Sequence, residues 1–380
     1  MRIVNDTFKK TIMAGTSRRK VIRAMALGGA SFLFSPLSCL STTGSRQKKL
    51  GVALVGLGYY STDLLAPALQ MTKNCYLAGI VTGTPAKAER WQKQYQIPDK
   101  NIYNYSNFDQ IASNDEIDIV YVVLPPSMHM EYVVRAAKAG KHVWCEKPMA
   151  MTVRECQAMI DACRDNKKSL AIGYRLQHEP HTKEFRRIVQ NGLLGKVKSL
   201  QCSAGYRESR TDHWKQKKEM GGGVLGDMGV YAIQGARLGT NMEPLSVVSA
   251  KFSTNRPDVY RNGLPEIAEA RLSFPGGVIA DIKTSFAENI NSLDITFEKG
   301  NLKMSPYQAY AGLHGSSPLG EIHFSYEVPW QQANQMDEDA RSIMDNRKMA
   351  APGEEGLNDI RVVEAIYASV EQQKEIKVFS

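Results

Sequence analysis

Between residues 50 and 174, short apolar runs alternate with stretches whose apolar positions recur at helical spacing. The apolar runs predict strands over Leu50–Val55, Tyr76–Val81, Ile117–Leu124, Lys141–Cys145 and Ser169–Tyr174. The periodic stretches predict helices over Ser61–Met71, Pro85–Tyr95, Met128–Ala139 and Thr152–Asn166. Nearly unbroken apolar runs are typical of parallel strands that are buried on both faces. This α/β alternation predicts an N-terminal Rossmann domain with a doubly wound parallel sheet over residues 50–174.

The pattern changes after about residue 174. A predicted helix over Lys183–Asn191 is followed by strand-like segments over Val197–Tyr206, Leu245–Ser253, Glu266–Phe274, Val278–Phe286 and Leu293–Glu298. Pro275–Gly277 predicts a hairpin turn, and Gly221–Leu238 a helix entered through glycines. Consecutive strands predict a C-terminal α+β domain over residues 175–356 with a large open, mostly antiparallel sheet. An amphipathic helix over Leu357–Gln373, within the segment 357–380, is expected to return to the Rossmann domain.

The positive charge of the chain is concentrated at its N-terminus. The formal net charge is +9, but ten of the 48 lysines and arginines and one of the 39 acids fall within residues 1–49. After position 49 there are therefore 38 residues of each sign. A folded part without net charge gives no reason to expect a polyanionic partner, so no nucleic-acid binding is predicted.

Residues 1–41 have the composition of an export signal. The basic segment Ser17–Arg23 precedes an uncharged stretch, Ala24–Leu40, that ends in small residues. This stretch is too short and too rich in glycine to predict a membrane span. The pair Arg18-Arg19 resembles the twin-arginine (Tat) signal, so we expect the Tat machinery to export the folded protein to the periplasm. A basic tail with a chance arginine pair and a lipid anchor at Cys39 are the alternatives.

The six cysteines have neither disulfide-framework nor zinc-site spacing. They contain no C-x-x-C pair, and the five that follow the leader are odd in number. A protein that folds in the reducing cytoplasm before export needs no disulfide. The sequence therefore predicts no disulfide framework and no metal site.

A glycine turn follows the first predicted strand. Gly56 and Gly58 lie in a G-x-G-x-x-S pattern between a strand and a helix. The first glycine permits a tight turn, and the second lets the backbone approach a pyrophosphate at the helix N-terminus. Isolated G-x-G patterns are often ordinary turns, but the strand–turn–helix context predicts a dinucleotide-binding site.

The end of the second strand bears on the choice of cofactor. An NAD site usually has an acid there that binds the ribose 2′-hydroxyl. This chain instead has Thr82, Gly83 and Thr84, followed by Lys87. Hydroxyls and an ammonium suit a 2′-phosphate, so NADP is favoured, with NAD as the alternative. Lys87 could also be an ordinary solvated lysine, as most lysines are.

Another loop is expected at the carboxyl edge of the sheet, where ligands bind. Leu124 and Pro125 end the strand that begins at Ile117, and His129 follows on the next helix. Leu124 and Pro125 are candidate cofactor contacts. For His129, contact with the cofactor and capping of the helix are equally weighted alternatives.

Three residues form a candidate catalytic constellation. Lys147 follows a late strand in Glu146-Lys147-Pro148, and Asp227 and Tyr231 are spaced i,i+4 on one face of a predicted helix. A tyrosine hydroxyl titrates near pH ~10 and is a poor base, but a neighbouring ammonium stabilises the phenolate. A Lys–Tyr pair could then remove a hydroxyl proton as hydride leaves the same carbon, with Asp227 orienting substrate or tyrosine. Without Lys147, this helix would more simply pack Tyr231 into a core.

Together these motifs resemble the Gfo/Idh/MocA family of oxidoreductases, and within it the glucose–fructose oxidoreductase branch. The resemblance rests on Val55–Gly58, Tyr105–Asp109, Ala139–His142, Cys145–Ala150, Gly173–Arg175, Gly221–Gly223, Asp227–Tyr231 and Pro352–Gly356. It implies that Lys147 and Tyr231 are the catalytic pair, that a sugar or polyol is the substrate, and that the open sheet forms a homo-oligomer, either a dimer or a tetramer. The implied cofactor site adds to the residues above Tyr59, Tyr60, Tyr105, Glu146, Arg175, Trp214, Lys215 and Tyr310.

One feature departs from that branch. Its namesake has a long N-terminal arm that embraces the adenine end of NADP, whereas here only the short segment 42–49 separates the signal from the first strand. The sequence therefore does not predict permanent retention of NADP or a ping-pong exchange between two sugars.

Three functions are consistent with the motifs. We expect an exported NADP-dependent sugar oxidoreductase that moves hydride between a carbinol carbon and nicotinamide C4. A glycoside hydrolase that uses transient oxidation by NAD is the second hypothesis, although Gly173–Arg175 resembles the oxidoreductase branch more closely. The third hypothesis is a non-catalytic NADP-binding protein.

Overall fold

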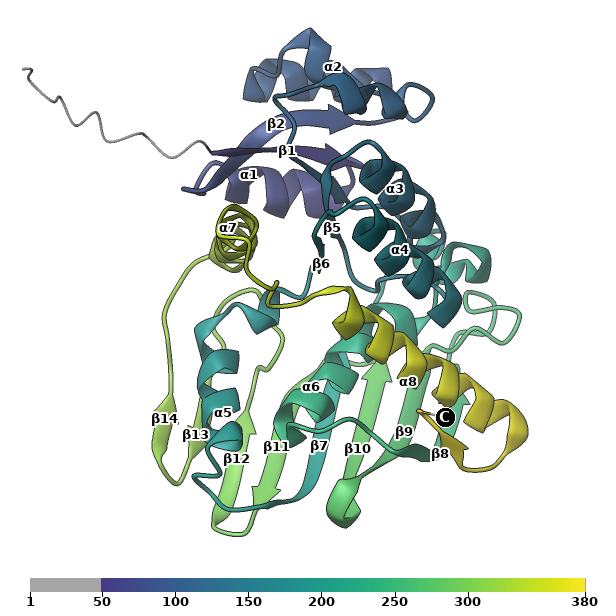
Figure 1. The fold of residues 1–380 in the computed structure, drawn as a ribbon. Coiled ribbons are helices and arrows are strands. Elements are labelled where there is room, and N and C mark those ends of the chain that lie inside the picture. Colours follow the sequence, from purple (N-terminus) through teal and green to yellow (C-terminus); the bar gives the residue numbers. More distant parts are fainter. Residues whose placement is uncertain (1–48, 380) are drawn as a thin grey trace, which may run out of the picture. The chain divides into compact units, whose positions relative to one another are not determined.

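The computed structural model of the protein describes residues 49–379. These residues belong to one compact unit that contains two sheets (Figure 1). The predicted export signal over residues 1–41, Cys39, and the segment 42–49 except for Lys49 lie outside the described residues. Within residues 49–379, no helix is long and apolar enough to cross a bilayer.

The first sheet is parallel throughout and has the strand order β3-β2-β1-β4-β5-β6. Its strands are β1 (Leu50–Val55), β2 (Cys75–Val81), β3 (Ile102–Tyr103), β4 (Ile119–Val122), β5 (His142–Cys145) and β6 (Leu170–Ile172). The predicted doubly wound parallel sheet is confirmed. The structure adds the two-residue edge strand β3, which is too short to leave a pattern in the sequence.

The helices of this domain begin and end at residues with clear local signals. They are α1 (Ala66–Leu69), α2 (Pro85–Tyr95), α3 (Pro126–Lys138) and α4 (Val153–Asp165). Thr152 and Glu155 form a reciprocal capping box at the start of α4. Only the first helix differs in type from the prediction, which places an α-helix over Ser61–Met71. In the structure, Tyr60–Leu65 forms a π-helical turn, and the α-helix α1 begins after it.

Apolar side chains cover both faces of the first sheet. Val55, Val122 and Cys145 point to the face that α3 and α4 cover. Leu54 and Trp144 belong to a second cluster on the other face, which includes residues of α1 and α2 and a long helix from the far end of the chain. The strands are therefore buried on both faces, as their unbroken apolar composition predicts.

The second sheet has nine strands in the order β14-β13-β12-β11-β7-β10-β9-β8-β15. All neighbouring pairs are antiparallel except β7 with β10. The strands are β7 (Val197–Gly205), β8 (Ser246–Ser253), β9 (Ile267–Phe274), β10 (Val278–Ser285), β11 (Ile290–Phe297), β12 (Gly300–Met304), β13 (Gly315–Ser317), β14 (Gly320–Ile322) and β15 (Ile376–Lys377). The predicted large, mostly antiparallel sheet is confirmed, and Pro275–Gly277 forms the turn between β9 and β10.

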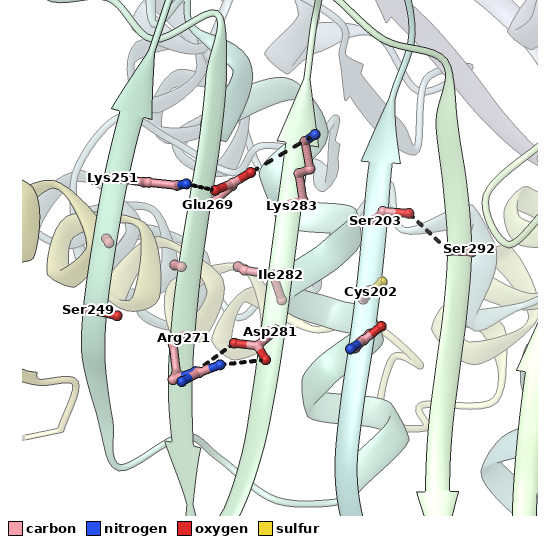
Figure 2. Close-up of a pocket in the computed structure, with 13 residues that line it drawn as sticks. Cys202, Ser203, Ser249, Lys251, Glu269, Arg271, Asp281, Ile282, Lys283 and Ser292 are labelled. Carbon is pink, nitrogen blue, oxygen red and sulfur yellow. Dashed lines mark hydrogen bonds and ion pairs between the residues drawn. The ribbon is translucent and has the colours of Figure 1, made fainter.

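Helices cover one face of this sheet (Figure 1). They are α5 (Pro180–Gln190), α6 (Val230–Thr240) and α8 (Gly353–Gln372), with a π-helical turn, Leu225–Gly229, directly before α6. The opposite face is not covered by a helix of the described chain (Figure 2). Asp227 therefore lies in the π-helical turn and Tyr231 in α6, whereas the sequence predicts both in one α-helix.

Two C-terminal helices connect the sheets. Helix α7 (Trp330–Met344), which the sequence analysis does not predict, places Ala333, Met336 and Ala340 in the core of the first sheet. This packing departs from the prediction that residues 175–356 form the second domain. Helix α8 packs on α4 and β6 of the first domain and also on α6 and β8 of the second.

Candidate active site

The glycine turn after β1 is shaped by close packing on one side and by open space on the other. Gly56 has a φ of 91°, and a Cβ atom there would lie 2.4 Å from the carbonyl oxygen of Val123. Ser61 donates a hydrogen bond of 2.6 Å to the carbonyl of Gly56 and so fixes the turn. A Cβ atom on Gly58 would meet no atom within 4 Å. The turn therefore offers the bare backbone surface that a pyrophosphate needs.

An ammonium lies beside this turn, next to the end of β2. Lys87 in α2 donates a hydrogen bond of 3.0 Å to the carbonyl of Leu57. Thr82 is buried, and a Cβ atom added to Gly83 would lie 3.1 Å from the ring of Tyr105. These residues meet at the edge where a dinucleotide ribose lies in this fold. The arrangement suits a ribose that carries a phosphate.

His129 holds two loops together. Its ring is buried, with Nε2 at 2.7 Å from the carbonyl oxygen of Leu124 and Nδ1 at 3.0 Å from that of Pro148. Burial lowers the pKa of the ring. Both nitrogens face backbone carbonyl oxygens, so the ring does not cap the N–H groups at the start of α3. His129 instead holds the strand end at Leu124–Pro125 against the loop of residues 146–148, which we call the Lys147 loop.

Lys147 is bound by Asp227 of the second domain. Its ammonium donates to the Oδ1 atom of Asp227 at 3.0 Å and to the Asp227 carbonyl at 2.8 Å. Burial alone would lower the pKa of Lys147, but Asp227, Tyr231 and Glu146 together outweigh it and raise that pKa. Burial would likewise raise the pKa of Asp227, but Lys147 and Lys215 outweigh it and hold that pKa well below its usual range. Lys147 and Asp227 are therefore both charged.

Two cations flank the ring of Tyr231. The Lys147 Nζ atom lies 4.6 Å from the ring centroid, and the Arg175 Cζ atom lies 5.4 Å from it. The prediction pairs Lys147 with the tyrosine hydroxyl, whereas the ammonium lies over the ring and bonds to Asp227. Asp227 consequently orients the two lysines rather than the tyrosine. Cations over an aromatic face are favourable when they are shielded from water.

Arg175 is held rigidly beside Tyr310. Its guanidinium lies 4.5 Å from the Tyr310 ring centroid and donates to the carbonyl oxygens of Ala309 and Gln308 and to Gln331. Tyr60 also approaches this ring, with the two centroids 6.4 Å apart. Arg175, Tyr310 and Tyr60 therefore form one wall beside Tyr231.

Glu146 is a buried carboxyl next to the catalytic candidate. Its Oε1 atom accepts a hydrogen bond of 2.6 Å from the Tyr121 hydroxyl, which in turn accepts one of 3.2 Å from Gln335 in α7. Burial raises the pKa of Glu146 to about 7, although the Tyr121 hydrogen bond and the charge of Lys147 both lower it. A neutral carboxyl beneath the Lys147 loop is thus accessible near neutral pH.

Most of the predicted site residues come together, and a few lie apart from the catalytic candidates. Lys147, Asp227 and Tyr231 form one cluster with predicted residues Arg175, Lys215 and Tyr310. Trp214 is placed beside Lys215, while Tyr59 is 63 % exposed at the glycine turn. The site also includes four residues that the sequence analysis does not predict: Tyr121, Tyr206, Gln331 and Gln335.

A dinucleotide turn and a lysine at the carboxyl edge of a parallel sheet, joined by an aspartate and a tyrosine from a second domain, define an NAD(P)-dependent oxidoreductase. Residues 50–174 match the oxidoreductase family with an NAD-binding Rossmann fold, and residues 182–303 match the GFO/IDH/MocA C-terminal domain. The chain belongs to the Gfo/Idh/MocA family of oxidoreductases, as its motifs predict.

Relatives of known structure and activity resemble nearly the whole described chain. The aldose-aldose oxidoreductase of Caulobacter crescentus, solved with glycerol, is 36% identical, with a TM-score of 0.83 over 87% of this chain and 100% of that chain. The D-xylose 1-dehydrogenase [NADP(+)] of Haloarcula marismortui is 25% identical over 338 residues, which cover 86% of this chain and 92% of that protein. A levoglucosan dehydrogenase, solved with NADH and levoglucosan, is 19% identical with a TM-score of 0.76, over 88% of this chain and 100% of its own, and shares the fold.

Proposed function

We propose that this protein is an exported NADP-dependent sugar oxidoreductase that transfers hydride between the carbinol carbon of an aldose and nicotinamide C4. The observation that carries the proposal is the Lys147–Asp227–Tyr231 cluster at the carboxyl edge of the dinucleotide sheet. Similarity to an aldose-aldose oxidoreductase and to a D-xylose dehydrogenase supports a sugar as the substrate.

The residues present fit a dinucleotide at the glycine turn. Gly58 and the N-terminal end of the following helix would hold the pyrophosphate, since no side chain fills the space above Gly58. Lys87 and Thr82 would hold the adenosine ribose. When bound, the nicotinamide supplies the acceptor or donor of hydride.

The chain's own groups handle the proton and the orientation of the sugar. In sugar oxidation, the phenolate oxygen of Tyr231 takes the proton of the carbinol hydroxyl as hydride leaves the carbon, and the tyrosine becomes a neutral hydroxyl. The charges of Lys147 and Arg175, which lie 4.6 Å and 5.4 Å from the centroid of the Tyr231 ring, stabilise the negative charge on oxygen during the transfer. Asp227 keeps Lys147 in place because it binds the ammonium at two atoms. In sugar reduction the same tyrosine returns the proton.

The choice of NADP rests on the end of β2. The segment Thr82–Thr84 contributes no carboxylate that would repel a 2′-phosphate, and the Lys87 ammonium lies at the adjacent turn. A charge-assisted hydrogen bond to phosphate is among the stronger polar contacts. These features support NADP over NAD.

Export through the Tat machinery to the periplasm is proposed from residues outside the described range. The support is the pair Arg18-Arg19 ahead of an uncharged segment. Replacement of both arginines by lysine in the full chain is expected to leave the protein in the cytoplasmic fraction. Periplasmic recovery of that variant would contradict Tat export, and a membrane fraction that depends on Cys39 would favour a lipid anchor.

Homo-oligomer formation through the uncovered face of the second sheet is also proposed. This face has a hollow of about 510 Å³, and its charges form pairs such as Lys251–Glu269 and Arg271–Asp281 (Figure 2). The hollow lies on the sheet face opposite α6 and is not the candidate active site. Ser249→Arg on this face is expected to lower the mass measured by light scattering, and Ser209→Arg in an exposed loop is the control.

The sugar oxidoreductase proposal is tested by turnover. Wild-type protein and Lys147→Ala are incubated with NADP⁺ or NAD⁺ and a panel of aldoses, and formation of the reduced nicotinamide is followed by absorbance. We expect turnover with NADP⁺ and at least one aldose, and a loss of at least about 100-fold in Lys147→Ala because the cation beside Tyr231 is gone. Full activity of Lys147→Ala would refute the mechanism. Aglycone release from a nitrophenyl glycoside without net cofactor turnover would instead support the glycoside hydrolase hypothesis.

A further inference from the structure

The Asp227 carboxylate is bound by two lysines, one at each oxygen. Lys147 donates to Oδ1 at 3.0 Å, and Lys215 donates to Oδ2 at 2.5 Å. The side chains of these three residues are only 10% to 15% exposed. Asp227 is thus the centre of a buried Lys–Asp–Lys bridge. No motif in the sequence predicts the second half of that bridge.

Lys215 has a well-defined place in the second domain. It lies two residues after His213, whose ring accepts a hydrogen bond from the Lys215 backbone N–H, in a short 3₁₀ turn between β7 and α6. Its ammonium donates to the Tyr206 hydroxyl at 2.8 Å. The ring of Tyr206 has its centroid 5.2 Å from Nζ and that of Phe286 has its centroid 5.9 Å away. The ammonium of Lys215 is therefore held by polar and aromatic groups of the second domain.

The charges around Asp227 leave one positive charge in excess. Lys147 and Lys215 face its carboxylate, and the Tyr206 hydroxyl lies 3.4 Å from Oδ2. The Tyr206 hydroxyl also donates a hydrogen bond to the Glu208 carboxylate. Glu208 in turn forms an ion pair with Arg210, with 2.5 Å between Oε2 and Nη2. The two lysines and one aspartate consequently carry a net charge of +1 next to Tyr231. Glu146 on the first domain is the other acid that faces Lys147.

An excess cation has a direct consequence for hydride transfer. Negative charge develops on the carbinol oxygen, or on the tyrosine that takes its proton, as hydride leaves. A fixed positive charge in a site shielded from water lowers the energy of that state more than in bulk water. The bridge also fixes the direction of the Lys147 ammonium, because Asp227 cannot rotate while both of its oxygens are held.

We propose that Lys215 is a positioning residue of the reaction, which acts by binding the second oxygen of Asp227 and thereby fixing Lys147 beside Tyr231. This inference rests on the proposed sugar oxidoreductase function. It differs from the cofactor-lining role that family resemblance implies for Lys215, because the ammonium is directed to Asp227 and Tyr206. The two roles predict different behaviour of one set of variants.

The test compares Lys215→Met, Lys215→Arg and the control Lys217→Met in the full-length protein. Lys217 lies in the same loop, pairs with Asp212 and has a side chain that is 43% exposed. For each variant, kcat, KM and the pH profile of sugar oxidation are measured with saturating NADP⁺. NADPH affinity is measured separately by fluorescence titration.

We expect Lys215→Met to lower kcat at least about 10-fold and to keep NADPH affinity within about twofold of wild type. Loss of a neighbouring cation makes deprotonation of the base harder, so the rising limb of the oxidation profile moves to higher pH by about one unit. Lys215→Arg keeps the positive charge, and Lys217→Met changes a residue outside the bridge. For both variants the rising limb of the pH profile should therefore lie at the same pH as in wild type. An unchanged limb together with weakened NADPH binding would overturn the proposal in favour of a cofactor contact, and an unchanged kcat would overturn it outright.

A measurement without turnover separates this proposal from the proposed function. Carbon-13 NMR of aspartate carboxyls, with Asp227→Asn to identify the signal, follows the ionisation of Asp227 in wild type and Lys215→Met. We expect the carboxyl to begin to protonate at a pH that is about one to three units higher in Lys215→Met. If the wild-type protein were inert towards every sugar, the proposed function would fail, while this titration would still decide whether Lys215 holds Asp227. Identical titrations in both proteins would refute the bridge.

Discussion

Replacement of Glu146 by glutamine is expected to stabilise the apoprotein at alkaline pH. Glu146 is buried behind the Lys147 loop, where the Tyr121 hydroxyl is its hydrogen-bond partner at 2.6 Å. Burial raises the pKa of Glu146 to about 7 despite that hydrogen bond and the charge of Lys147. The native state therefore favours the neutral carboxyl, whereas the unfolded chain ionises at its ordinary pKa of about 4.3. Glutamine imitates the neutral form and does not titrate.

The sign and size of the effect follow from these two pKa values. A carboxyl whose pKa is raised on folding stabilises the native state least when it is ionised, so stability is lost as pH rises from the unfolded pKa to the folded pKa. One pKa unit corresponds to about 1.4 kcal/mol, so the loss is about 1 kcal/mol at pH 5 and about 3.5 kcal/mol at pH 8. The advantage of Glu146→Gln should therefore grow by roughly 2.5 kcal/mol between these pH values.

The assay is urea unfolding of wild type and Glu146→Gln without added dinucleotide, at several pH values from 5 to 8. Any difference in hydrogen bonding between the two side chains is independent of pH and cancels in the comparison. Other raised carboxyls, such as Asp359, titrate in both proteins and cancel as well. Glu371→Gln, at an exposed position of α8, is the matched control. A stability difference that is constant with pH would refute the reasoning.

Three further predictions concern the cofactor turn and the contact between domains. Lys87→Ala should weaken NADP binding about 10-fold or more and leave NAD binding unchanged, because an ammonium near the ribose is lost; isothermal titration measures both. Gly58→Val should reduce dinucleotide affinity with little loss of thermal stability, whereas Gly56→Val should lower the melting temperature, since only Gly56 has a positive φ and a blocked Cβ position. Arg237→Ala should lower the free energy of unfolding by about 3–5 kcal/mol, because the buried carboxyl of Asp359 then loses its partner at 2.6 Å.

The sequence predicts most of the first domain because its signals are local. Helix α2 begins at Pro85 and ends before Gln96, which has a left-handed φ of 56°, and both ends agree with the prediction. The capping residues Thr152 and Glu155 likewise set the start of α4. Unbroken apolar strands and short loops leave few alternatives to a parallel sheet.

Helix α7 shows where local patterns are insufficient. Its buried face contains Gln331, Gln332, Gln335 and Asp339 as well as Ala333, Met336 and Ala340. Polar residues on a buried face hide the helical period, because they are buried only through partners that lie far away in the chain. Gln335, for example, bonds to Tyr121, more than 200 residues earlier.

The candidate site was predicted as a set of residues but not as a geometry. Family motifs place Lys147, Asp227 and Tyr231 in one site, and the structure brings them together. The sequence could not show that the ammonium lies over the tyrosine ring, since this depends on the π-helical turn that carries Asp227. The Lys215 contact depends on a loop without a regular pattern, which only the folded chain positions.

The central claim is that Tyr231 and Lys147 serve a hydride transfer between a sugar carbon and nicotinamide. It is tested most directly by a single turnover of an aldose that carries deuterium on its reacting carbon, with the label located by mass spectrometry. We predict that wild type places the deuterium on the nicotinamide ring, and that Tyr231→Phe does so at least about 100-fold more slowly while it binds NADPH normally. Deuterium lost to solvent, or transfer at an undiminished rate in Tyr231→Phe, would contradict the account.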